Sequence, residues 1–231
     1  MALLLNSFLP FLSCSSLQRL GAACTFATGC AITIDGEVFS HSATTATRAD
    51  GEWCTTESSG TTSLVAYGQH HLSGSDALGA YTGVELNWLC GSSPFATSVR
   101  LYSDHALGEF AIFAQRWPNG ANQTAAAPPS LDNVGDPRNS QERVSSVFPA
   151  FAPQPSSASK NMSYFVYHNQ MLGGMLDGTK YGAWSTEAIR ASGGVPGGTM
   201  GGPLVVFGSA PSAFAVVIAP VTNPMAMNPR W

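Results

Sequence analysis

Alternation of apolar and polar residues along the chain predicts short β-strands rather than helices. The clearest case is 96–117, where Val99 and Leu101 alternate with polar neighbours before a turn and a second apolar run. Period-2 alternation in β-branched and aromatic residues is typical of a strand with one buried face. The second run is apolar on both faces over 110–113, so we expect that strand in the middle of a sheet.

The same pattern recurs along most of the chain. Asp35-Gly36 favours a tight hairpin turn, 41–62 is polar and expected to be irregular, and 70–79 is expected to be a polar turn. Strands are expected at 31–40, 61–69, 82–90, 96–117, 162–168, 180–185, 203–208 and 212–219. About ten or more short strands with turn residues between them, and no helical linkers, predict an all-β fold, an antiparallel, supersandwich-like β-sandwich.

The two ends of the chain suggest how it is organised. Met1–Ser16 is apolar and ends in small residues, which resembles a signal peptide, although a positively charged start is missing. We therefore expect a signal peptide or disordered leader over 1–25, a wrongly assigned start being the alternative. A single β-sandwich domain is expected over 26–231. Because 213–220 is a strand close to the last residue, we expect this domain to be truncated at its C-terminal end.

Composition narrows the classes of function. Charged residues make up 10% of the chain, against about 25% in an average domain, and the net charge is −4 with no basic run. Nucleic acid binding requires clustered Lys and Arg, so a nucleic-acid partner is not expected. After the N-terminal segment no apolar stretch of about 18 residues follows, and we expect no membrane span.

The cysteines point to disulfides without fixing their pairing. None of the five lies in a C-x-x-C pair or at zinc-ligand spacing from a histidine. If Cys14 belongs to a removed leader, an even number remains, and three pairings are open. Separate buried thiols are an equally weighted alternative. The four in question are Cys24, Cys30, Cys54 and Cys90.

No catalytic, metal or cofactor site is expected. The acidic residues are scattered, and Glu85 and Glu109, which lie within strands, are better explained by a solvated sheet face than by a glycosidase pair. His70 and His71 are adjacent, and adjacent residues of a strand point to opposite faces, so sharing one metal ion is disfavoured. The glycine-rich stretch 193–202 lacks the Lys-Ser/Thr of a phosphate-binding loop.

Two tryptophans are candidates for ligand binding. Sugar rings stack on exposed aromatic faces, and Trp53 and Trp184 lie in polar stretches. Trp88 and Trp117 lie at strand positions and are expected in the core. For Trp53, anchoring of a loop onto the core is the more heavily weighted alternative.

Two sequons favour a secreted or extracellular protein. Asn122 begins Asn-Gln-Thr, Asn161 begins Asn-Met-Ser, and both lie in polar loops where an N-linked glycan could project. Sequons also arise by chance, so they add only modestly to the secreted interpretation.

Resemblance to a known family is carried by four segments: SVRLYSDHALGEFAIFAQRWPNG, VSSVFPAF, GGPLVVF and AFAVVIAPVTNPMA. Together they resemble the N-terminal β-sandwich domain of Sip1-type proteins, which are similar to α-galactosidases and raffinose synthases. The resemblance spans about 28–228. It implies a sandwich that packs against a (β/α)₈ barrel carrying the two catalytic aspartates, and no residue of this chain matches a catalytic position.

The implied function is a non-catalytic domain of a carbohydrate-active, glycoside hydrolase-like protein, with a catalytic barrel and a carbohydrate as the expected partners. A surface that faces such a barrel is expected to be apolar and exposed. The alternatives are a free-standing secreted carbohydrate-binding module and a structural cell-surface domain.

Overall fold

Strands joined by turns make up nearly all of the protein that can be described. The computed structural model describes residues 2–5, 20–26, 29–34, 36–42, 45–56, 62–103, 108–122, 146–148, 152–153, 162–167, 179–185, 204–208 and 215–219. Within these ranges there is no helix, and hence none long and apolar enough to cross a membrane. The predicted all-β, antiparallel sandwich is confirmed.

A nine-stranded antiparallel sheet is the largest unit of the fold. Its order is β15-β14-β16-β17-β1-β11-β10-β9-β8. The strands are β1 (Ala2–Leu5), β8 (Val65–Asp76), β9 (Gly79–Cys90), β10 (Ser93–Tyr102), β11 (Phe110–Arg116), β14 (Met162–Tyr167), β15 (Thr179–Ala183), β16 (Leu204–Gly208) and β17 (Ala215–Ala219). The predicted central hairpin is β10–β11, and β11 lies inside the sheet, as its two apolar faces indicated.

Two four-stranded sheets complete the fold. One has the order β13-β4-β3-β2, with β2 (Leu20–Thr25), β3 (Gly29–Ile34), β4 (Glu37–Ser42) and β13 (Ala152–Pro153). The other, called the small sheet below, has the order β12-β5-β6-β7, with β5 (Ala46–Ala49), β6 (Glu52–Thr55), β7 (Thr62–Ser63) and β12 (Ser146–Val147). Its β6–β7 pair is parallel.

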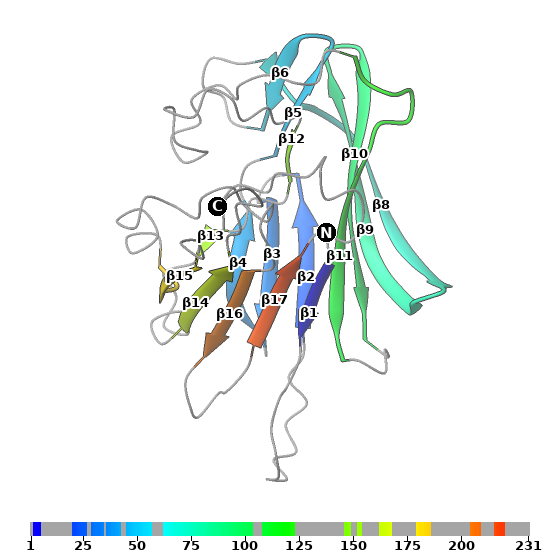
Figure 1. Ribbon diagram of the computed structural model, residues 1–231. Coiled ribbons are helices and arrows are strands. Elements are labelled where there is room, and N and C mark those ends of the chain that lie inside the picture. Colours follow the sequence, from blue (N-terminus) through cyan, green and yellow to red (C-terminus); the bar gives the residue numbers. More distant parts are fainter. Residues whose placement is uncertain are drawn as a thin grey trace.

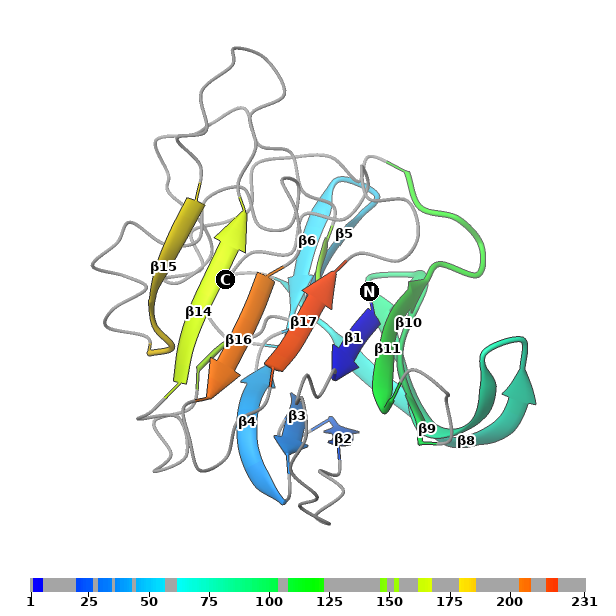
Figure 2. The same ribbon diagram turned by 60° about the horizontal axis from the view of Figure 1, so that its bottom comes forward.

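The sheets form layers around one core (Figure 1). Strands β2, β3 and β4 lie behind the half of the large sheet that contains β14, β16, β17 and β1, and the view in Figure 2 separates the same two layers. In Figure 1 the small sheet lies above β2, β3 and β4, and its strands β5 and β6 contact β9. Stacking of the sheets removes their inner apolar faces from water.

Alternating side chains place the core between the sheets. In β9 Val84, Leu86 and Trp88 are buried while their neighbours are more exposed, as predicted. The indole Nε1 of Trp88 donates a buried hydrogen bond of 3.0 Å to Thr97 Oγ1, which satisfies its one polar atom. Buried residues from all three sheets, among them Ile32 of β3, form a single cluster.

Both disulfides join strands, and they settle the pairing that the sequence left open. Cys24 is bonded to Cys30, its direct partner in the β2–β3 hairpin. Cys54 of β6 is bonded to Cys90 at the end of β9, which ties the small sheet to the large one. The alternative of separate buried thiols is therefore wrong for these four. Cys14 lies outside the described residues.

Two expected polar connections are strands instead. Within 41–62, β5 and β6 form a hairpin around Asp50 and Gly51, which both have positive φ (52° and 87°) and so make the tight turn that Asp-Gly favours. Within 70–79, β8 continues to Asp76, and the turn is confined to the residues just before Gly79. Strand β8 is an edge strand with no buried residue, and β5 and β6 are buried largely through small residues, so neither region shows the apolar alternation of a half-buried strand.

The N-terminal segment contributes to the large sheet. Strand β1 pairs antiparallel with β11 on one side and with β17 on the other. Strand β2 then begins at Leu20, whose amide donates a hydrogen bond to a carboxylate oxygen of Glu109. Residues of the range expected to be a leader therefore occupy positions in two sheets.

Candidate binding surfaces

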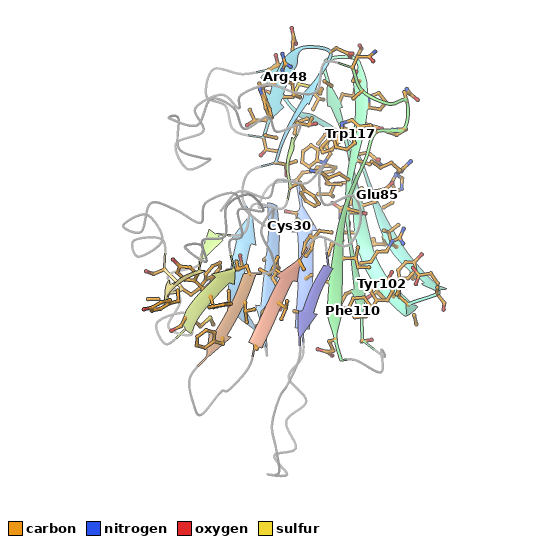
Figure 3. The ribbon with its side chains drawn as sticks, viewed as in Figure 1. Cys30, Arg48, Glu85, Tyr102, Phe110 and Trp117 are labelled. Carbon is orange, nitrogen blue, oxygen red and sulfur yellow. A yellow bond between two sulfur atoms is a disulfide. The ribbon has the colours of Figure 1, made fainter. Side chains whose placement is uncertain are left out.

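Two groups of side chains on the outer side of the large sheet stand out, and Figure 3 labels Tyr102 and Phe110 of the first group. The first, called the tyrosine–arginine cluster, consists of Asp76, Tyr81, Arg100, Tyr102 and Phe110 on β8–β11. It forms because these strands place paired residues side by side, Tyr102 lying between Tyr81 and Phe110 in the register.

Each side chain of the tyrosine–arginine cluster contacts another. The Tyr102 hydroxyl donates a 2.8 Å hydrogen bond to Asp76 Oδ2, and Arg100 Nη1 lies 3.5 Å from the same oxygen. The Arg100 guanidinium lies 4.9 Å from the centre of the Tyr81 ring. The rings of Tyr102 and Phe110 stack with their centres 4.6 Å apart.

These contacts shift two pKa values in opposite directions. The Leu78 amide donates a 2.9 Å hydrogen bond to Asp76 Oδ1, and this bond, together with the one from Tyr102, holds the pKa of Asp76 below its ordinary value. Burial, followed by the hydrogen bond to Asp76, raises the pKa of Tyr102. The carboxylate stays charged and the phenol stays protonated over the same broad pH range.

The cluster is closed on itself, which favours a structural role. Asp76 and Arg100 balance each other's charge, and the hydroxyl of Tyr102 is used within the cluster. Asp76 lies at the turn end of β8, so its bond to Tyr102 holds the end of the β8–β9 hairpin against β10. The hydrogen bond between Tyr102 and Asp76, called the latch below, therefore fixes the turn end of the edge strand β8.

The second surface, called the aromatic face, consists of Phe165, Tyr181 and Phe207. Phe165 and Tyr181 are direct partners across β14–β15, and Phe207 pairs with Ser163, two residues before Phe165, so all three point to one side of the sheet. Their exposed fractions are 38%, 80% and 41%. Large aromatic side chains exposed together on a flat sheet are unusual for a surface that only meets water.

The strands of the aromatic face are apolar on both sides. Tyr164, Leu204 and Val206 alternate with the exposed residues and are buried on the inner side. The opposite half of the same sheet is different, since Glu85 there forms a 3.1 Å ion pair with Arg116 across the outer side of β9 and β11. The half of the sheet with β8 and β9 thus combines a balanced ion pair with the exposed Val65 and Tyr67 of β8, whereas the half with β14, β15 and β16 carries three exposed aromatic rings.

The tryptophans proposed as sugar platforms lie in other positions. Trp184 follows β15 directly and is 1% exposed, packed edge-on against Tyr164, so it is a core residue with no free ring face, and the expectation of a loop platform does not fit its position. Trp53 lies in β6 opposite Arg48 and is partly buried. Trp88 is in the core. Trp117 packs against the core, and the centre of its ring lies 5.3 Å from that of Phe95.

One of the two sequon asparagines lies in the part of the chain that the structure describes. Asn122 is exposed after the turn that follows β11, and Asn161 lies outside the described residues. His70 and His71 are successive exposed residues of β8. Among the residues that the structure describes, no group of three His, Cys, Asp or Glu side chains could hold a metal ion.

The aromatic face has a signature in the sequence. The expected strands 162–168 and 203–208 are apolar at consecutive positions, as a strand buried on both sides is. In the fold one of these sides stays exposed.

No protein-family model matches the chain, and comparisons with curated proteins and with solved structures find no significant match.

Proposed function

We propose that this chain is a non-catalytic β-sandwich domain that works by binding, through its aromatic face, to a second domain. The resemblance described above suggests the catalytic barrel of a carbohydrate-active protein similar to α-galactosidases and raffinose synthases as that second domain. The observation that carries the proposal is the exposure of Phe165, Tyr181 and Phe207 on strands whose other side is core.

Physical chemistry favours coverage of this face. Burial of apolar surface is worth about 25 cal/mol per Å², so three large side chains gain several kcal/mol when a partner covers them. Coverage of the surface around Glu85 and Arg116 gains less, because desolvation of these charges costs more than their pairing returns. The expected partner surface is therefore apolar and limited to the side of β14, β15 and β16.

Association of the purified chain tests this proposal. We expect self-association that weakens in Tyr181→Ser and Phe207→Ser, measured by analytical ultracentrifugation. Tyr67→Ser on β8 is the matched control, because Tyr67 is also exposed but lies at the far edge of the sheet. A chain that is monomeric at high concentration with all three side chains intact would count against a docking face.

A hydrolysis assay tests the non-catalytic part. Purified full-length chain is expected to leave a chromogenic α-galactoside uncleaved. Measurable turnover, if it co-purifies with the chain and disappears in a variant of one of its own acidic residues, would refute this part of the proposal.

The second candidate is a free-standing secreted carbohydrate-binding or cell-surface module. The exposed ring of Tyr181 favours it, since sugar rings stack on such faces. Titration with raffinose and pull-down on insoluble polysaccharides separate the two candidates. Sugar binding that is lost in Tyr181→Ser supports the module, and association without sugar binding supports the docking domain.

Secretion is part of both candidates. Disulfides persist mainly in oxidising compartments, and both described pairs join strands of the fold. We propose an extracellular location on this basis. Labelling of free thiols in protein taken from its native source tests it, with Cys54 and Cys90 expected to be protected until a reductant is added.

A further inference from the structure

The sequon at Asn122 lies on a well-held piece of backbone. After β11 the chain turns, and the amide of Gly120 donates a 3.0 Å hydrogen bond to the carbonyl of Trp117. Ala121 then packs against the core, and Asn122 follows it as an exposed residue. The position is thus an exposed bend that directly follows a packed residue.

A contact with the small sheet fixes this bend further. The backbone carbonyl of Asn122 accepts a 2.8 Å hydrogen bond from the amide of Asp50, in the turn between β5 and β6. The carboxylate of Asp50 in turn accepts a hydrogen bond from the Ser93 hydroxyl at the start of β10. The contact with Asp50 uses the backbone carbonyl of Asn122, and the side-chain amide of this exposed residue takes no part in it.

We infer that Asn122 is a modification site that carries an N-linked oligosaccharide, an inference that rests on the secretion part of the proposed function. In the reaction the amide Nδ2 of Asn122 forms a bond to the anomeric carbon of a lipid-diphosphate-linked oligosaccharide. The bond between that carbon and the diphosphate oxygen breaks, the lipid diphosphate leaves, and the amide nitrogen gives up one proton. Thr124 completes the acceptor sequence Asn122-Gln-Thr124.

The site suits a bulky glycan because of where it lies. The β5–β6 turn, whose Asp50 binds the Asn122 carbonyl, lies in Figure 1 at the end of the molecule away from β14 and β16. A glycan there leaves the aromatic face open to its partner. It covers instead the rim where Asp50 and Ser93 join the small sheet to the large one.

Translation of the full chain into microsomes, with an added signal sequence, tests the inference. Translocated protein is defined by its protection from added protease, and its glycosylation is read by peptide mass after enzymatic release of N-glycans. In the translocated chain we expect a glycan at position 122 in wild type and in Thr124→Ser. We expect none there in Asn122→Gln or in Thr124→Ala. Asn122→Gln keeps the backbone carbonyl that binds Asp50, so its thermal unfolding should match that of the unglycosylated wild type.

An unmodified Asn122 in translocated wild-type protein overturns the inference, whatever happens at Asn161. This outcome leaves the docking proposal standing, because association through the aromatic face is measured on unglycosylated protein. Conversely, unglycosylated protein that stays monomeric refutes docking, while modification of Asn122 in the translocated protein still supports the glycan.

Discussion

The hydroxyl of Tyr102 on β10 donates a hydrogen bond to the carboxylate of Asp76 on β8, across the intervening strand β9. This bond connects the edge of the large sheet to its interior, because Tyr102 is buried and stacked on Phe110. Strand β8 otherwise exposes both of its faces along nearly its whole length. The edge strand is therefore held at its turn end by one polar contact and its neighbours.

Removal of this hydroxyl tests the latch. Tyr102→Phe keeps the stacked ring and deletes the bond to Asp76, and we expect it to lower the free energy of unfolding by about 1 kcal/mol, as for a hydrogen bond to a charged group that is partly exposed. Hydrogen exchange should rise in β8 and stay unchanged in β11. Uniform loosening of the whole sheet would show that the bond is not a local latch.

The charge of Asp76 gives the latch a pH dependence. Because the pKa of Asp76 is lower in the folded chain than its ordinary value of 3.8, the carboxylate contributes stability that is fully present above about pH 4 and is lost as the pH falls through the folded pKa. We expect the difference in unfolding temperature between wild type and Asp76→Asn to shrink as the pH is lowered from 6 to below 3. Calorimetry at both ends of this range measures it, and a constant difference would contradict the expectation.

Deletion of the two disulfides should have unequal effects. Cys54–Cys90 closes a sequence separation of 36 and Cys24–Cys30 one of 6, and loop entropy predicts losses of about 4 and about 2 kcal/mol. Paired Cys→Ala variants compared by chemical denaturation measure both. Equal losses would mean that contacts in the folded state, rather than loop length, dominate.

A close approach of two strands makes Gly83 sensitive to substitution. A Cβ atom at Gly83 would lie 2.0 Å from the carbonyl oxygen of Val99 on β10, so Gly83→Ala must push β9 and β10 apart, at a cost of about 3 kcal/mol. Gly68→Ala on β8 is the control, because its nearest neighbour, His70 Nε2, is 3.4 Å away at the end of a side chain. The control should change the free energy of unfolding by less than about 0.5 kcal/mol.

Strands with a buried face could be predicted from the sequence, and strands without one could not. Val84, Leu86 and Trp88 announce β9 because burial selects apolar residues at every second position. Strand β8 has no buried residue, so its sequence resembles a turn. Strands β5 and β6 are buried through small residues such as Ala46 of β5 and Thr55 of β6, which a hydrophobic pattern does not register.

The binding surfaces depended on contacts between distant parts of the chain. Trp184 lies among polar residues in the sequence, yet it is buried, and Tyr164, twenty positions earlier, packs edge-on against its ring. The aromatic face arises only because the β14–β15 register places Phe165 beside Tyr181. The sequence shows which aromatic residues are present, and the pairing of the strands decides which of them are exposed.

The two disulfides also differ in what must already be folded when each one forms. Cys24 and Cys30 face each other across a hairpin whose strands adjoin in sequence, so they can oxidise as soon as that hairpin exists. Cys54 and Cys90 belong to different sheets and meet only when the small sheet has docked on β9. The order in which the two bonds appear during oxidative refolding would thus record the order of assembly, with the second bond marking the moment when the sheets come together.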